Sequence, residues 1–168
     1  MKVLKSLFLF LILVGVIVSC GKKEAEKKEG LNYENKATST QQTSINEVLL
    51  TANDAMQFNT KEIRIEAGKK VKLTLKHIGK LNKQAMGHNF VLLNQNVDLV
   101  AFANKAATAS ATDYIPKNET KNIIAHTKLL GGGETDAIEF DAPKVGTYEF
   151  LCSFPGHYVM MKGIFIVE

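Results

Sequence analysis

The sequence has little of what nucleic-acid-binding proteins use. It contains no tryptophan and a single arginine, Arg64, and its lysines are dispersed along the chain. The formal net charge is +4 and the pI is about 9.0, but nucleic-acid binding is indicated by a basic stripe with aromatic side chains interleaved. The excess of lysine therefore predicts a solvated surface, and we expect no nucleic-acid partner.

Cysteine is also scarce, with only Cys20 and Cys152 present. Cys20 ends an N-terminal leader and Cys152 lies close to the C-terminus, so we expect no disulfide between them. In the leader, two lysines precede the apolar run Leu7 to Val18. A basic start and an apolar run too short to span a membrane are typical of a secretory signal peptide. We predict such a peptide over residues 1–19.

The residues around Cys20 indicate lipid attachment. Ile17-Val18-Ser19-Cys20-Gly21 resembles the lipobox of bacterial lipoproteins, in which the cysteine is lipidated and becomes the mature N-terminus. The alternative is an uncleaved N-terminal anchor, and either one would tether the chain outside the cytoplasmic membrane. Lipidation would also explain an unpaired cysteine in an exported protein. We expect a lipid-anchored protein of the cell envelope, in the periplasm. Gly21 is not an acidic retention signal, which favours the outer membrane.

Residues 20–43 are predicted to be a lipidated N-terminus and a flexible linker. Lysine and glutamate alternate after Cys20, and a Thr/Ser/Gln-rich run follows up to Thr43. Such a composition buries too little apolar surface to offset the entropy lost on ordering. The linker would connect the lipid anchor to a domain over residues 44–168.

The domain shows the pattern of an all-β protein. Short segments with alternating or continuous apolar residues are separated by turn residues, and Val71 to His77 is the clearest half-buried strand. Short strands at this spacing favour a β-sandwich with Greek-key connections. Val97 to about Thr112 is alanine-rich and lacks glycine and proline, so we predict one helical flap outside the sandwich.

The loop from Cys152 to Met161 contains a thiol, an imidazole and thioethers. Cys152 and His157 are separated by four residues, and His157 and Met161 by three. Sulfur ligands with imidazole select copper, and two histidines, a cysteine and a weak axial methionine form the blue-copper pattern. Met86-Gly87-His88 supplies the second histidine. Taken singly, each of these residues is more often a core or hydrogen-bonded side chain, but their combination predicts a metal site.

The chain resembles the azurin family, the bacterial blue-copper electron carriers, over nearly all of residues 44–168. Four segments match in order: Met56 to Thr60, Met86 to Asn89, Ile124 to Leu129, and Cys152 to Gly163. The Cys-x₄-His-x₃-Met spacing is azurin-like. The resemblance implies a cupredoxin-like Greek-key β-sandwich of about eight strands with the helical flap outside it.

The resemblance also implies a ligand set for one copper ion per chain. His88, Cys152 and His157 would be the strong ligands, Met161 the long axial ligand, and the Gly87 carbonyl oxygen a second, weaker axial contact. Met160 is one residue off the family spacing and is not expected to be a ligand. Asn89 would connect the two ligand loops, and the Phe154 backbone N–H would donate to the Cys152 sulfur.

Two departures from the family concern the core and not the site. Asn46 and a residue near Gly68 stand where cysteines that form a disulfide are expected, and Phe90 stands in place of a tryptophan. His77 lies near the position of a histidine that is not a ligand in the family, and His126 matches a surface histidine.

The function implied is that of a one-electron carrier cycling between Cu(I) and Cu(II). Its expected partners are redox proteins such as a cytochrome c or a copper or haem reductase or oxidase. Electrons would pass through the outer edge of His157, and weak redox encounters use small interfaces. The apolar docking surface would include Met56, Leu81, Met86, Phe154, Pro155, Gly156, Val159 and Met160.

A copper site is also found in proteins of two other functional classes. A copper-binding or delivery protein would favour an exposed, labile site, whereas this loop is expected to enclose its metal. An enzyme is not expected. A dinuclear copper oxidase needs a second cysteine between Ser153 and Met161, and multicopper oxidases and nitrite reductases need several domains and more than the four histidines present.

Overall fold

The computed structural model describes residues 45–168. The signal peptide predicted over residues 1–19, the lipidated Cys20 and the linker over residues 20–43 lie outside the described residues. Within those described, no helix is both long enough and apolar enough to cross a membrane.

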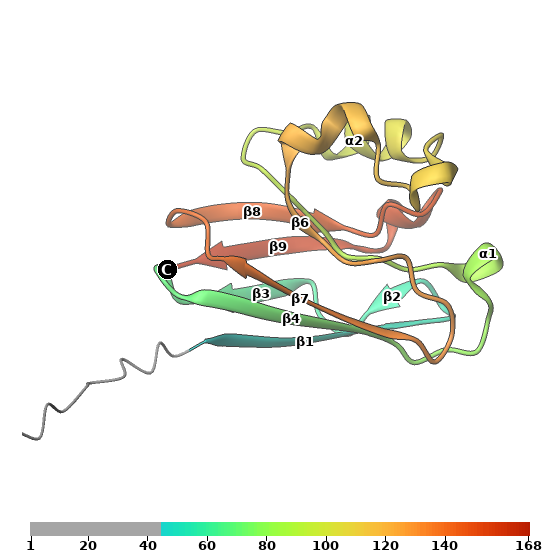
Figure 1. Ribbon diagram of the computed structural model, residues 1–168, viewed down its shortest axis with the longest axis horizontal. Coiled ribbons are helices and arrows are strands. Elements are labelled where there is room, and N and C mark those ends of the chain that lie inside the picture. The colour runs from blue at the N-terminus through green and yellow to red at the C-terminus, as the bar shows by residue number, and fades with distance from the viewer. Residues whose placement is uncertain (1–44) are drawn as a thin grey trace, which may run out of the picture. The chain divides into compact units, whose positions relative to one another are not determined.

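The domain is a sandwich of two β-sheets (Figure 1), as predicted. The first sheet has the order β2-β1-β4-β7 and the second the order β3-β9-β8-β5-β6. The bounds of the nine strands are β1 Asn46–Asn53, β2 Gln57–Phe58, β3 Glu62–Ile65, β4 Lys70–His77, β5 Val91–Leu93, β6 Ile123–His126, β7 Thr135–Asp141, β8 Gly146–Leu151 and β9 Lys162–Val167. The expected number was about eight. Strand β2 consists of only two residues, paired with the end of β1.

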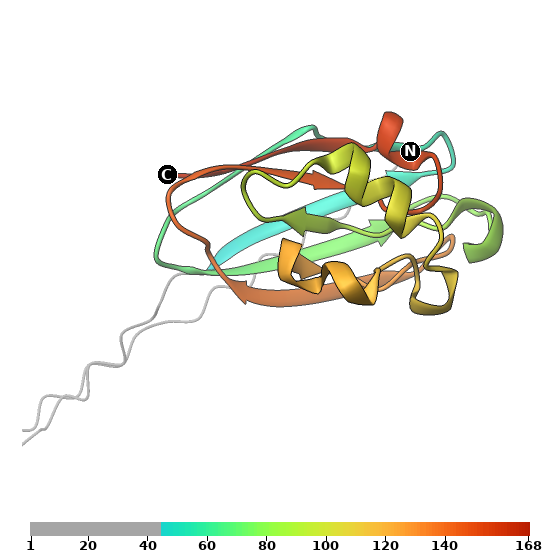
Figure 2. The same cartoon turned by 90° about the horizontal axis from the view of Figure 1, so that it is seen from above.

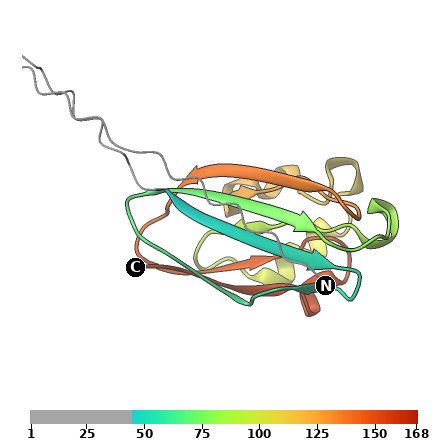
Figure 3. The same ribbon diagram turned by 90° about the horizontal axis from the view of Figure 1, so that it is seen from below.

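Strand β4 shows why these residues form a sandwich. Val71, Leu73, Leu75 and His77 are buried, and the residues between them are half-buried or exposed, as expected when successive side chains point to opposite faces of a sheet. Strand β4 pairs in parallel with β1 and antiparallel with β7. The first sheet therefore turns one apolar face toward the second sheet, and Figure 3 shows β1, β4 and β7 side by side.

Aromatic rings fill the space between the sheets. Phe90, Phe150 and Phe165 are fully buried, and the ring centroids of Phe90 and Phe150 lie 5.5 Å apart. Phe58 packs on the other side of Phe150 at 5.8 Å. Centroid distances of about 4.5–7 Å are typical of favourable aromatic pairs. Phe90 thus keeps an aromatic ring in the core at the position where the family resemblance implied tryptophan.

Asn46 connects two parts of the chain that lack a disulfide. Its Nδ2 donates to the Glu66 carbonyl at 2.9 Å, and its Oδ1 accepts from the Glu66 N–H at 3.0 Å. The paired hydrogen bonds hold the start of β1 against the turn after β3.

The predicted helical flap is α2, Leu99–Ala106, followed by a 3₁₀ turn at Ser110–Thr112. It lies across the outer face of the second sheet (Figure 2). Phe102 and Ala106 of α2 pack with Val91 and Leu151 of the sheet in a second apolar cluster. The Asp98 side chain caps the helix by accepting from the N–H groups of its first turn.

Three further helical turns were not predicted: α1 (Lys83–Met86), Lys117–Asn122 and His157–Val159. Each is too short to show a helical period in the sequence.

Candidate metal centre

The ligand candidates gather at one end of the sandwich. The β8–β9 loop, α1 and β2 all lie at this end (Figure 1). His88 precedes β5 and Cys152 follows β8, and these two strands are antiparallel neighbours with Val91 opposite Leu151. The start of one strand therefore lies beside the end of the other. This pairing brings together two residues that are 64 positions apart.

Three donor atoms face one another inside the protein. The Cys152 Sγ lies 3.6 Å from the His157 Nδ1 and 3.9 Å from the His88 Nδ1. The donor atoms of the three residues all lie within 4.8 Å of one another, and all three side chains are buried. A thiol sulfur and two imidazole nitrogens in this arrangement fit the N₂S donor set that copper prefers.

Met161 and Gly87 complete the surroundings of the sulfur. Met161 is fully buried and belongs to the same apolar cluster as Cys152, whereas the adjacent Met160 is half exposed. The Gly87 carbonyl oxygen lies 3.8 Å from the Cys152 Sγ. A Cβ at Gly87 would come within 2.6 Å of the Lys83 carbonyl oxygen and 2.9 Å of the Phe154 ring. Glycine therefore allows the backbone to approach the site closely.

The ends of the β8–β9 loop are joined by a backbone hydrogen bond. The Cys152 N–H donates to the Met161 carbonyl at 2.9 Å, and the Met161 N–H donates to the His157 carbonyl at 2.7 Å. Gly156 adopts a left-handed conformation with φ +79° just before His157. These contacts hold the loop in a closed turn, and the side chains of Cys152, His157 and Met161 are all buried.

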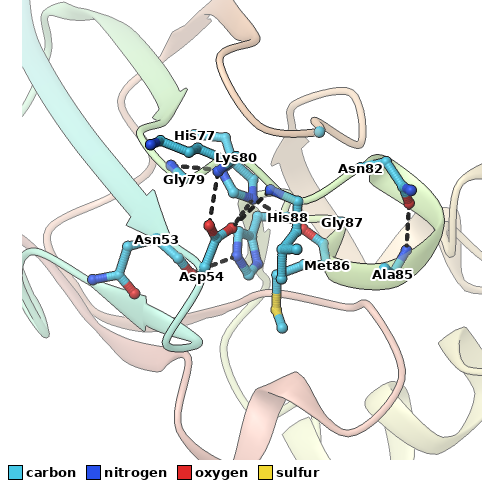
Figure 4. Close-up of polar contacts among 12 residues, drawn as sticks. Asn53, Asp54, His77, Gly79, Lys80, Asn82, Ala85, Met86, Gly87 and His88 are labelled. Atoms are coloured by element: carbon cyan, nitrogen blue, oxygen red, sulfur yellow. Dashed lines mark hydrogen bonds and ion pairs between the residues drawn. The ribbon is translucent and has the colours of Figure 1, made fainter.

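The orientation of the His88 ring is set by a hydrogen bond of its Nε2, the ring nitrogen that does not face Cys152. The His88 Nε2 lies 2.9 Å from the Asn53 carbonyl oxygen, which can only accept (Figure 4). The Nε2 therefore carries the proton, and the lone pair of Nδ1 faces Cys152. His77 stacks on the ring of His88 with a centroid distance of 4.4 Å. The His77 Nδ1 accepts from the Gly79 N–H and its Nε2 contacts the Met86 carbonyl.

Asp54 connects the β1–β2 turn to the chain after β4. Its carboxylate accepts from the N–H groups of Lys80 at 2.7 Å and Leu81 at 3.2 Å (Figure 4). The Lys80 N–H is the main cause that lowers the pKa of Asp54 below its ordinary value. No local sequence pattern marks Asn53 or Asp54 as part of the site, because their partners lie 26 or more positions away.

Asn89 connects the two ligand segments. Its Oδ1 accepts from the Ser153 N–H at 2.8 Å, and its Nδ2 donates to the Ser153 Oγ at 2.8 Å. The Ser153 hydroxyl also donates to the Tyr114 carbonyl, so the segment after α2 is attached to the same point. The contact of Asn89 between the two loops was expected from the family resemblance, whereas the role of Ser153 was not predicted.

Burial sets the protonation of the three donors. It lowers the pKa of His88 and that of His157 to about 4. Burial raises the pKa of the Cys152 thiol to about 12, against the opposing effect of the Asn89 and Phe154 backbone N–H groups. In the metal-free protein at neutral pH, the imidazoles are therefore neutral and the thiol is protonated.

The residues expected to form the docking surface lie at the same end of the molecule, on or near the ligand loops. Met56, Leu81, Val159 and Met160 are exposed apolar side chains. Pro155 and Gly156 are also exposed, while Met86 and Phe154 are half-buried. The Phe154 ring lies 4.6 Å from the His157 ring.

Residues 45–168 match the family model of copper binding proteins, plastocyanin/azurin family. Azurin-2 of Alcaligenes xylosoxydans xylosoxydans is 46% identical over 122 residues, which are 70% of this chain and 93% of that protein. Outer membrane protein H.8 of Neisseria gonorrhoeae is 42% identical over 115 residues, which are 67% of this chain and 62% of that protein.

A solved azurin from the methylotroph Methylomonas sp. strain J has a TM-score of 0.67 and 30% identity, and the match covers 73% of this chain and 98% of the azurin. The cupredoxin fold expected from the sequence is thereby confirmed, and the donor set fits the copper ion that the family binds. The chain is a member of the plastocyanin/azurin family of copper binding proteins.

Proposed function

We propose that the protein is a type 1 copper protein that carries single electrons between redox partners in the cell envelope. The observation that carries the proposal is the buried cluster of His88, Cys152 and His157, with the buried Met161 in the same core cluster as the cysteine. Copper bound there would supply a one-electron couple, Cu(I)/Cu(II). His88, Cys152 and His157 would be its strong ligands, with Met161 and the Gly87 carbonyl oxygen as weaker ones.

The protein's contribution is to hold these groups in nearly one geometry. The backbone bond between Cys152 and Met161 closes the ligand loop. Asn89 attaches this loop to the segment that carries His88, and the Asn53 carbonyl orients His88. Hydrogen bonds to the side chains that bind a metal orient these side chains and tune the reduction potential of the site. A site held in this way would change little between oxidation states.

Electron exchange requires no bond to be made or broken in a substrate, so we propose no enzymatic activity. His157 would be the route for electrons, because its loop neighbours Pro155, Gly156 and Val159 are exposed. Exposed apolar patches mark interaction sites. We therefore expect a redox protein such as a c-type cytochrome to dock on the apolar patch at this end of the molecule. The patch consists of Met56, Leu81, Met86, Phe154, Pro155, Gly156, Val159 and Met160. A copper-delivery role is less favoured, because all three strong donors are buried.

We further propose that the domain is attached to a membrane through lipidated Cys20, with residues 20–43 as a flexible linker. The lipobox-like residues around Cys20 support this. The similarity to outer membrane protein H.8 is consistent with it.

The first test is spectroscopic. We expect the Cu(II)-loaded chain to show an intense blue thiolate-to-copper band and a narrow EPR hyperfine splitting, and Cys152→Ser to lose both. Met161→Leu should change the spectrum or the reduction potential, whereas the matched Met160→Leu should retain both, since Met160 is half exposed. A pale spectrum in the wild type would contradict the electron-carrier assignment.

The second test counts protons. At pH 7, Cu(II) binding should release about one proton, because metal ligands bind deprotonated, the Cys152 thiol has a pKa of about 12 and the two imidazoles have a pKa of about 4. The number of protons released should rise above one only as the pH falls toward 4, where the histidines become protonated. Calorimetry in buffers of different ionisation enthalpy measures it. Cys152→Ser should release about none at pH 7, and release of about two or more by the wild type would show that the histidines are charged there.

The third test concerns docking. Met86→Lys or Met160→Lys should slow electron exchange with a basic c-type cytochrome by about tenfold, which corresponds to about 1.4 kcal/mol of lost docking energy. The matched control is Val145→Lys, which changes an exposed apolar residue in the loop before β8. Equal rates in all variants, measured by stopped flow, would exclude this docking surface.

The fourth test concerns the anchor. In fractionated cells, Cys20→Ser should move the chain from the membrane to the soluble fraction, while the control Cys152→Ser stays in the membrane. If the Cys20→Ser chain keeps its leader and remains in the membrane, the uncleaved anchor is the correct alternative.

A further inference from the structure

A polar groove adjoins the apolar patch on the side of Met160. It has a volume of about 290 Å³ and is lined by Gln57, Phe58, Asn59, Thr60, Lys61, Met160 and Lys162. Met160 belongs to both surfaces, so the groove is continuous with the proposed docking surface. The groove also contains two lysines that the docking surface does not include.

Glycine at position 163 allows the two lysine-bearing segments to approach each other. Strands β3 and β9 pair in parallel, and the Ile164 N–H donates to the Lys61 carbonyl at 2.9 Å. A Cβ on Gly163 would lie 2.3 Å from this carbonyl oxygen and 2.5 Å from the Phe150 ring. Only glycine fits between them. Lys61 and Lys162 are thereby held on two adjacent segments that line one groove.

Neither lysine has its charge balanced by a described residue. Both are exposed, and no ion pair joins Lys61 or Lys162 to another residue in 45–168. Glu62, the acidic residue next to Lys61, instead pairs with Arg64 at 2.7 Å. Two like charges that line one groove repel each other, and an opposite charge brought between them is attracted to both.

Two other lysines at this end of the molecule are paired with acidic side chains, whereas Lys80, next to Leu81, has no ion pair within residues 45–168. Lys83 lies 3.6 Å from Glu134, and Lys128 lies 3.8 Å from Asp136. Unbalanced positive charge in the lining of the groove therefore lies beside Met160. Charges beside an apolar contact surface steer a partner and fix its orientation more than they add affinity.

We propose that the groove beside Met160 receives acidic side chains of the redox partner, with Lys61 and Lys162 as the complementary cations. This inference rests on the proposed electron-carrier function and assigns the chemistry of the partner's docking face. The apolar patch would provide contact close to His157, and the lysine pair would select partners with carboxylates at the edge of their own contact surface.

The test compares two c-type cytochromes of opposite surface charge, each mixed by stopped flow with the copper-loaded full chain in neutral detergent. For the acidic cytochrome at low salt, Lys61→Gln/Lys162→Gln should lower the bimolecular rate constant by about tenfold, the scale of electrostatic steering. The loss should shrink as salt shortens the Debye length to about 8 Å near 0.15 M. For the basic cytochrome, the rate should stay the same or rise.

The matched control is Lys72→Gln/Lys144→Gln, which removes the same charge. Lys72 lies toward the start of β4, and Lys144 lies in the loop before β8. Both are therefore at the ends of strands away from the ligand loops, and neither has an ion pair within 45–168. The bimolecular rate constant of this control variant should stay within about twofold of that of the wild type, because the control substitutions leave the charge near the docking face unchanged.

Three results would overturn the inference. Equal rates for the groove variant and the control, with an active wild type, would reject the acidic docking site and leave the electron-carrier function intact. No exchange of the wild type with either cytochrome or with hexacyanoferrate would reject the proposed function itself. If the groove substitutions leave the cytochrome rates unchanged but weaken binding of the Cys20→Ser chain to phosphatidylcholine–phosphatidylglycerol vesicles, the lysines face a membrane instead.

Discussion

The antiparallel pairing of β5 with β8 is the constraint on which the site depends. Val91 lies opposite Leu151, so His88 and Cys152 emerge from neighbouring strands at the same end of the sandwich. The contacts between Asn89 and Ser153 extend this pairing beyond the last ladder position. His157 and Met161 then need only a short loop, closed by the bond between Cys152 and Met161. The rest of the fold keeps these two strands in register.

Burial of the donor atoms has two physical consequences. Desolvation keeps the imidazoles neutral and the thiol protonated without metal, as the shifted pKa values of His88 and Cys152 show. It also requires partners for the remaining polar atoms, because an unpaired buried group is costly. The Asn53 carbonyl meets this need for His88. Within residues 45–168, no buried side-chain nitrogen or oxygen lacks a hydrogen-bond partner.

The end of the sandwich that carries the ligands combines surfaces of different chemistry. Exposed apolar side chains such as Val159 and Met160 surround a buried polar cluster. The same Met160 borders a groove lined by two lysines that form no ion pair within residues 45–168. Apolar contact permits brief association, and charge determines which partner arrives in a productive orientation. If the protein docks a redox partner here as proposed, the two surfaces would separate the tasks of electron transfer and partner choice.

Much of the protein was predictable from the sequence. The period-two pattern of Val71 to His77 indicated a half-buried strand, and the spacing of Cys152, His157 and Met161 indicated copper, because local patterns reflect local backbone geometry and ligand chemistry. The Gly-His pair before an apolar run also indicated His88 as the second histidine, and the family resemblance favoured Met161 over Met160 as the expected ligand. Only the tertiary structure showed that Asn53 orients His88, that Asp54 connects two turns, and that Gly163 lets Lys61 approach β9. These contacts join residues that are far apart in the sequence, and no local pattern reports them, since they arise from strand pairing and close packing between segments.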